Sequence, residues 1–220
     1  MRHADVGRMD QSRSARRALG IEYLTLGWNS IEAVVAIASG VIAASVALTA
    51  FGIDSGIELF SAAIVAVRLR SLIIRGEANE AKELRALRFV AVSFFALALY
   101  VLLDATLSLA LGEHPAVSPA GIAITTAALI VMPALAIAKR RVAVRLDAER
   151  LPGPAALLRA DAAETAICAV LSATTLIGLG LNAGFGWWWA DPAASLVVVY
   201  FAVKEGYEAW HGELACADDD

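Results

Sequence analysis

Residues 46–67, VALTAFGIDSGIELFSAAIVAV, are apolar over a length that can cross a lipid bilayer as one helix, yet they include Asp54 and Glu58. About 20 helical residues span the ~30 Å hydrocarbon core of a bilayer. The i, i+4 spacing projects both carboxyl side chains from one helix face, one turn apart. A charged side chain at the bilayer centre costs at least about 2.5 kcal/mol, so such residues usually mark ion pathways.

A second apolar run, residues 160–181, ADAAETAICAVLSATTLIGLGL, contains Glu164 and Cys168 at the same spacing. Carboxylates and a thiolate are ligands for divalent transition metals. Four potential ligands at matching spacing in two runs predict a cation site inside a membrane. The alternative is a pair of interhelical hydrogen bonds between protonated carboxyl groups, which would only hold the helices together.

The composition also indicates a membrane protein. Apolar residues make up 59% of the chain and the mean hydropathy is +0.67, whereas about 45–50% of residues are apolar in soluble domains. We therefore expect an all-α membrane protein with six transmembrane helices. They are predicted near Tyr23–Ala43, Val46–Val67, Phe89–Leu111, Pro119–Ala138, Ala160–Leu181 and Pro192–Tyr207.

The basic residues are distributed unevenly along the chain. All 18 Lys and Arg residues lie before the first span, between the second and third spans, between the fourth and fifth spans, or at the end of the sixth span. Lys139 is the first basic residue after the fourth span. The positive-inside rule then puts both termini in the cytoplasm, in agreement with an even number of spans. We predict an Arg-rich cytoplasmic segment (1–18), a six-helix transmembrane domain (19–210) and an acidic cytoplasmic tail (211–220), in a plasma or inner membrane.

The four candidate ligands should meet at similar depths. The second span runs from outside to inside and the fifth from inside to outside, so antiparallel packing pairs Asp54 with Cys168 and Glu58 with Glu164. Three oxygen ligands and one sulfur ligand can form a four-coordinate site near the middle of the membrane.

Other polar residues of the spans are candidates for an accessory role or a proton path. Asp161 lies one turn before Glu164; it either helps to load the site or sits at the membrane interface beside Arg159, and the interface is favoured. Asp104 is deep in the third span and serves either as a proton relay or in a hydrogen bond to Ser or Thr. Asn29 and Glu32 lie in the inner half of the first span, where they either line a vestibule or pair structurally.

Four segments resemble those of one family, the cation diffusion facilitators, also called the cation efflux family. Residues 45–71, SVALTAFGIDSGIELFSAAIVAVRLRS, resemble the family's second span, and residues 159–172, RADAAETAICAVLS, its fifth. Residues 187–210, WWWADPAASLVVVYFAVKEGYEAW, resemble the sixth span, and residues 28–48, WNSIEAVVAIASGVIAASVAL, fit the first. The resemblance covers most of residues 21–210 and favours a short, membrane-only branch without the family's C-terminal cytosolic domain.

The resemblance implies a proton-coupled exporter of divalent transition metals, most often Zn2+, that works as a homodimer. The family's mid-membrane ligands fall on Asp54, Glu58, Glu164 and Cys168, although Glu and Cys replace the usual His and Asp in the fifth span. Such ligands bind metal only when deprotonated, so metal and protons compete. This set suits Zn2+ and also accepts Fe2+, Mn2+, Co2+ or Cd2+.

Three other classes of protein rank lower, and one of them, an exporter of organic cations that uses the same carboxylates, would need a wide apolar pocket with aromatic residues. A non-transporting membrane scaffold or accessory subunit would tolerate replacement of all four candidate ligands. An intramembrane enzyme is disfavoured, because the chain has no HExxH motif and no Ser has an intramembrane His partner. We expect no enzymatic activity, no prosthetic group and no nucleic-acid partner; the partners are the metal ion, protons, the lipid bilayer and a second copy of the chain.

Overall fold

The computed structural model describes residues 2–75, 80–112 and 116–211. Within these ranges the chain forms six helices and no strand. The helices are α1 (Arg2–Ala43), α2 (Val46–Arg75), α3 (Glu80–Leu111), α4 (Pro119–Ala148), α5 (Pro152–Phe185) and α6 (Ala190–His211). Apart from His211, the predicted acidic tail lies outside the described residues.

The fold is all-α and membrane-integrated, as predicted. Four stretches are long and apolar enough to cross a membrane by length and composition: Arg13–Ala43, Ala91–Leu111, Pro119–Ala148 and Pro152–Phe185. Large apolar side chains are also exposed on the outside of the bundle, among them Val34 at 70% and Ile130 at 72%. Soluble proteins rarely expose apolar surface on this scale. Membrane crossing by α2 and α6 stays a prediction.

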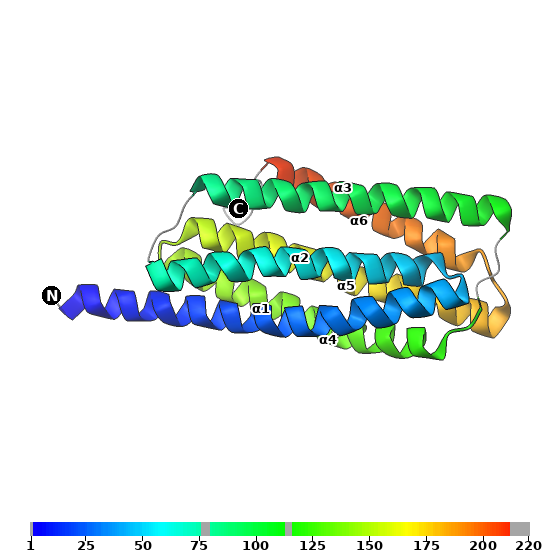
Figure 1. Cartoon of the computed structure of the whole chain (residues 1–220), viewed down its shortest axis with the longest axis horizontal. Helices are drawn as coiled ribbons and strands as arrows, with labels where there is room; N and C mark the ends of the chain where they lie inside the picture. The colour runs from blue at the N-terminus through cyan, green and yellow to red at the C-terminus, as the bar shows by residue number, and fades with distance from the viewer. Residues whose placement is uncertain (1, 76–79, 113–115, 212–220) are drawn as a thin grey trace.

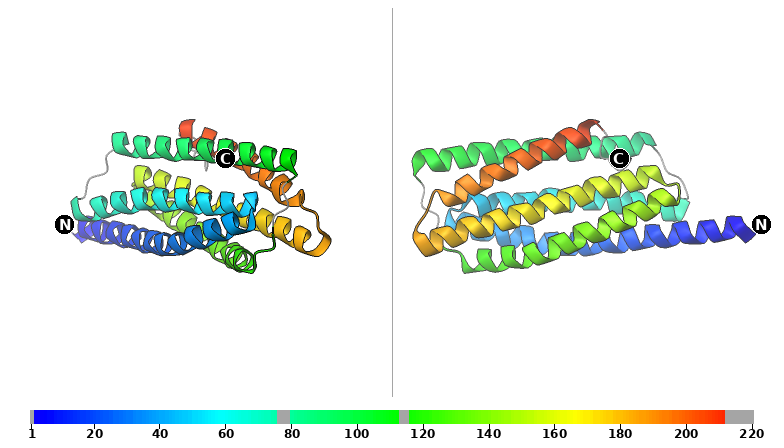
Figure 2. Two further views of the ribbon diagram at one scale, coloured as in Figure 1. Left: turned by 45° about the vertical axis from the view of Figure 1, so that its right-hand side comes forward. Right: turned by 180° about the vertical axis from the view of Figure 1, so that it is seen from behind.

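The helices run lengthwise and alternate in direction (Figure 1). They pack mainly as three pairs, α1 with α2, α4 with α5, and α3 with α6, and α2 also contacts α5. Figure 2 shows the α3–α6 pair along one side of the bundle in both views. The first helix begins and the last helix ends toward the same end of the bundle (Figure 1).

The α1 and α2 backbones approach closely at Gly52. A Cβ atom at this position would lie 2.7 Å from the backbone nitrogen of Ile37, which is too close for any larger residue. A Cβ atom at Gly56, one turn further along α2, would meet nothing within 4 Å. The close contact therefore depends on one glycine of the two.

The fourth helix continues well past its predicted end at Ala138. It reaches Ala148, and α5 begins at Pro152, so the predicted connection between these spans is mostly helical. The apolar face of α4 explains the extension, because Val142, Ala143 and Leu146 are buried. Burial of this face stabilises the added turns.

Two apolar clusters close the interior of the bundle at different heights. The proximal cluster, nearer the chain termini, consists of Ala18, Val65, Leu69, Val142, Ala143, Leu146, Ala155, Leu157, Leu158 and Ala160. The distal cluster consists of Ala36, Leu48, Phe51, Ala128, Met132, Cys168, Leu171 and Val198. A third cluster attaches α3 and α6 to α2 and α5 through Ala50, Phe94, Leu97, Ala98, Val101, Ile167 and Ala202.

Candidate cation site

Buried polar side chains fill the bundle between the proximal and distal clusters. On each of α1, α2, α4 and α5, they lie between residues of the two clusters in the sequence. We call this set the polar layer. Its members are Glu22, Thr25, Asn29, Glu32, Asp54, Ser55, Glu58, Ser61, Lys139, Asp161, Glu164, Thr165 and Cys168, which also belongs to the distal cluster, each no more than 2% exposed.

The distal half of the polar layer is centred on Glu32. The Ser55 hydroxyl donates a hydrogen bond to Glu32 Oε1 at 2.7 Å, and the Cys168 thiol reaches the same oxygen at 3.4 Å. The indole N–H of Trp28 donates to Glu32 Oε2. Asp54 lies beside Cys168. A carboxyl group of α1 thus joins the α2 and α5 residues that the sequence singled out.

The proximal half is centred on the Lys139 ammonium group. Lys139 Nζ forms an ion pair with Asp161 and lies 3.7 Å from a carboxyl oxygen of both Glu22 and Glu58. The Thr165 hydroxyl accepts a hydrogen bond from Lys139 at 2.8 Å and lies 2.5 Å from Glu58 Oε1, to which it donates. Lys139 of α4 therefore holds carboxyl groups from α1, α2 and α5 together.

The four predicted ligands are all buried and lie in the polar layer. Glu164 is near Asp54 and Glu58, so the layer is continuous from one half to the other. Among the described residues, the carboxyl oxygens of Asp54 and Glu164 form no hydrogen bond of ordinary geometry, although Asp54 lies beside Cys168 and Glu164 beside Ser61. In this arrangement no group of three or more His, Cys, Asp or Glu side chains within the described ranges is positioned to hold a metal ion.

Two residues in the proximal half of the polar layer lie in surroundings that the sequence did not predict. Lys139, predicted in a cytoplasmic connection, is fully buried in the bundle. Asp161, for which the sequence favours an interface position beside Arg159, is fully buried in the bundle and accepts a hydrogen bond from Ser61 at 3.1 Å. Arg159 instead pairs with Asp147 at 2.7 Å, near the bundle surface.

The remaining candidates divide between the layer and the periphery. Asn29 is buried and lies within reach of Glu58, so it belongs to the polar layer. Asp104 lies outside it, on α3. Its partner is the Tyr100 hydroxyl, which donates at 2.8 Å, rather than the Ser or Thr hydroxyl considered above.

The buried charges of the layer do not balance. Lys139 is the only fully buried basic side chain among the described residues, and it faces a larger set of buried carboxyl groups. These are Glu22, Glu32, Asp54, Glu58, Asp161 and Glu164. An uncompensated ion costs several kcal/mol when it is removed from water. The layer must therefore carry protons, bound cations or both.

Sequence reasoning missed Glu22 and Lys139 as members of this layer. A signal was present in the helical spacing. On α4, Lys139 continues the buried face of Met132 and Ala136 at i+7 and i+3, and the apolar pattern resumes at Val142 and Ala143. A charge in the middle of such a face indicates a buried group with partners on other helices.

Comparison with known proteins is consistent with this geometry. A profile of the cation efflux transmembrane domain matches residues 23–210, a range that contains almost the whole polar layer. The chain matched none of the curated proteins with which it was compared.

Proposed function

The chain belongs to the cation efflux family, and from that premise we propose that it exports a divalent transition-metal cation, Zn2+ first among the candidates, in exchange for protons. Members of this family are cation transporters of the cation diffusion facilitator kind and not enzymes. The observation that carries the proposal is the excess of buried carboxyl groups over the single ammonium group of Lys139. Such a layer is stable only with positive charge added to it.

We assign Asp54, Glu58, Glu164 and Cys168 as ligands of the transported cation. The unpaired oxygens of Asp54 and Glu164 support this choice, because these groups can turn toward a cation without breaking a hydrogen bond. Glu58 would have to give up its hydrogen bond from the Thr165 hydroxyl in order to bind the cation. The ligand set comes together when the cation enters, through side-chain rotation and a small shift of α2 against α5.

Glu32 is a further ligand candidate. Its Oε1 atom lies within 3.4 Å of the Cys168 sulfur, so a cation bound to that sulfur has a third helix within reach. Oxygen and sulfur ligands together favour Zn2+ and also admit Fe2+, Mn2+, Co2+ and Cd2+.

Proton coupling follows from the chemistry of the ligands. Carboxylates and thiolates bind metal in their deprotonated form, so each bound cation replaces protons and returning protons release it. Lys139 supplies a fixed positive charge beside Glu58 and Asp161. That charge limits the repulsion among the carboxylates while the site is empty of metal.

Access would alternate through the two apolar clusters. The polar layer is sealed from both ends of the bundle, with Asp54 and Glu164 each 1% exposed. Parting of the proximal cluster would open the layer to the side that holds the termini, and parting of the distal cluster would open it to the other side. Helix groups that rock around a midplane site are the usual basis of such exchange.

The distribution of Lys and Arg supports a cytoplasmic location for both termini, and hence for the proximal cluster. Six membrane crossings, a plasma or inner membrane and a homodimer complete the proposal. The homodimer rests on the family resemblance, and cross-linking in native membranes would test it.

The test is metal flux in proteoliposomes under an imposed pH gradient. Zn2+, Mn2+, Fe2+, Co2+ and Cd2+ are supplied in turn to wild type, Asp54→Asn and Glu164→Gln. We expect gradient-dependent flux of at least one metal in wild type and its loss in both variants. Asp104→Asn is the matched control, because Asp104 lies outside the polar layer.

Absence of flux for every metal, with folded protein verified, would contradict transport and favour the scaffold alternative. Flux that survives in Asp54→Asn and Glu164→Gln would leave transport standing but remove these residues from the site.

A further inference from the structure

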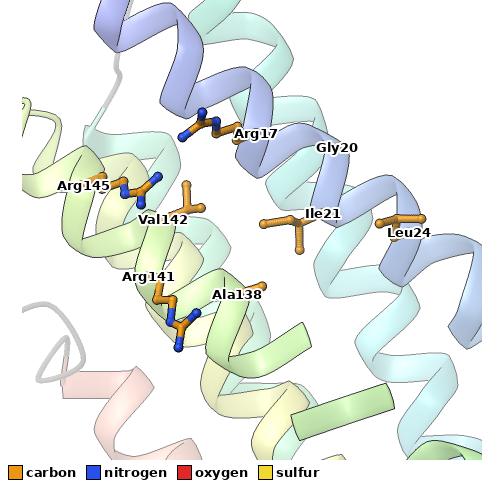
Figure 3. A pocket seen from close by; sticks show the side chains of 8 residues that line it. All are labelled: Arg17, Gly20, Ile21, Leu24, Ala138, Arg141, Val142 and Arg145. Atoms are coloured by element: carbon orange, nitrogen blue, oxygen red, sulfur yellow. The ribbon is translucent and has the colours of Figure 1, made fainter. Parts of the chain in front are cut away.

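A cleft of about 440 Å3 lies between α1 and α4, on the side of these helices away from the polar layer. Figure 3 shows its lining from both helices. The lining residues are Arg17, Gly20, Ile21, Leu24, Ala138, Arg141, Val142 and Arg145.

One end of the cleft is basic. Figure 3 shows the guanidinium groups of Arg17 and Arg145 facing one another across the opening, with Arg141 one turn away on α4. All three side chains are exposed, and no acidic residue lines the cleft. In the part of the chain that the structure describes, none of the three arginines forms a salt bridge. Among the described residues, this positive charge therefore has no salt-bridge partner.

The rest of the cleft is apolar. Ile21 and Val142 form its middle, Leu24 lies further along α1 from Arg17, and Ala138 lies one turn from Arg141 on α4 (Figure 3). Leu24 is 67% exposed. A Cβ atom at Gly20 would meet nothing within 4 Å, so the glycine leaves open space in the wall.

We propose that this cleft binds an anionic phospholipid of the surrounding bilayer. Arg17 and Arg145 face one another as a phosphate headgroup requires, Arg141 adds positive charge one turn away, and Arg pairs with phosphate through two parallel hydrogen bonds. The apolar part matches the start of an acyl chain, which free phosphate would leave uncovered. Basic pockets between transmembrane helices on the cytoplasmic side are suited to such headgroups.

The location gives the lipid a structural role. Ile21 precedes Glu22 and Ala138 precedes Lys139, and the Glu22–Lys139 pair joins the same two helices on the inner side. A lipid in the cleft would bridge α1 and α4 from the outer side. It would therefore hold the proximal end of the bundle together, whichever cation is carried.

The test uses the full-length chain purified in detergent. Retention of phosphatidylglycerol is measured by native mass spectrometry, and the rise in Tm on its addition by thermal unfolding. Phosphatidylcholine with the same acyl chains and inorganic phosphate are separate arms. We expect retention and a Tm rise with phosphatidylglycerol alone.

The charge variant is Arg17→Gln/Arg141→Gln/Arg145→Gln. We expect its apparent affinity for phosphatidylglycerol to fall on the order of 100-fold, because each basic side chain near an anionic lipid adds to the attraction. The matched control is Arg13→Gln/Arg16→Gln/Arg140→Gln, which removes the same charge from exposed positions of the same helices outside the cleft. The control should lose less than about threefold.

The shape variant is Gly20→Leu, which fills the cleft without a change of charge. We expect it to lower phosphatidylglycerol retention at least about tenfold while the protein stays folded, since the new side chain meets open space. Equal losses in the two triple variants, or full retention in Gly20→Leu, would overturn the proposal. An equal Tm rise with inorganic phosphate would overturn it too, because the apolar half would then be unused.

Discussion

The four helices that form the polar layer differ from the α3–α6 pair in what they bury, although both groups are rich in apolar residues. Helices α1, α2, α4 and α5 bury carboxyl groups around Lys139. Among the side chains that the structure describes on α3 and α6, no charged group is buried. Their contact with the rest of the bundle is through residues such as Phe94, Leu97 and Ala202.

From this difference we infer that the proposed transport chemistry takes place among α1, α2, α4 and α5. A buried charge is tolerated only where other charges and hydrogen bonds compensate it. The four-helix group provides that compensation from several helices at once, whereas Asp104 on α3 has only Tyr100, one turn away on the same helix. A carboxyl group in an apolar helix is therefore a site candidate when partners on other helices surround it.

The largest expected effect is a loss of metal flux when a carboxyl group of the polar layer is replaced, compared with a carboxyl group on α3. Glu58→Gln removes a carboxylate oxygen from a proposed ligand and should lower metal flux at least about 100-fold, since even residues behind metal ligands contribute about 10–100-fold to affinity. Asp104→Asn should change flux less than about threefold. Proteoliposome flux at matched protein amounts measures both variants. Equal losses would mean that the two regions do not differ in function.

A large effect on stability is expected at Lys139. Lys139→Met leaves several buried carboxyl groups without their counter-charge and should cost about 3–5 kcal/mol. Lys139→Met/Asp161→Asn removes both sides of the closest pair, so it should cost less than the sum of the single changes by about 0.5–3 kcal/mol. Unfolding in mixed micelles measures the cycle. Strict additivity would show that the pair does not act as a unit.

An intermediate effect is expected at the α1–α2 contact. Gly52→Leu forces a side chain against the α1 backbone and should destabilise the fold by about 1–3 kcal/mol. Gly56→Leu is the matched control on the same helix, where the new side chain meets open space and gains helix propensity of roughly 0.5–1 kcal/mol. The same unfolding assay compares them. A tolerated Gly52→Leu would contradict the close approach.

The smallest effect is expected for the ion pair near the surface. Arg159 and Asp147 are 16% and 44% exposed, so their interaction is screened by solvent. Asp147→Asn should change the unfolding free energy by less than about 1 kcal/mol. A cost as large as that of Lys139→Met would remove the distinction between buried and surface charges in this protein.

Much of the fold follows from the sequence. The apolar runs predict the helices, and the i, i+4 spacing predicts that Asp54 and Glu58 share a face, as do Glu164 and Cys168. These are local properties, set by helix geometry and by the cost of exposing apolar surface. The family match agrees with the resemblance carried by the same segments.

Which residues make up the polar layer could not be predicted from such local properties of the sequence. Hydropathy ended the fourth span before Lys139, because a charge at the end of an apolar run usually lies at the membrane interface. Its burial depends on Glu22, Glu58 and Asp161, which are remote in sequence and come from three other helices. The ion pair of Asp161 with Lys139 was missed for the same reason, because the two residues lie on different helices.

The most direct test of the central claim is X-ray absorption of Zn2+ bound to the purified chain, compared with the Cys168→Ser variant. If the polar layer holds the cation, the wild-type spectrum contains a sulfur neighbour at about 2.3 Å together with oxygen neighbours. The variant would retain the oxygen neighbours and lose the sulfur. Bound Zn2+ with the same spectrum in both proteins would contradict the claim that Cys168 and the carboxylates around it form the site.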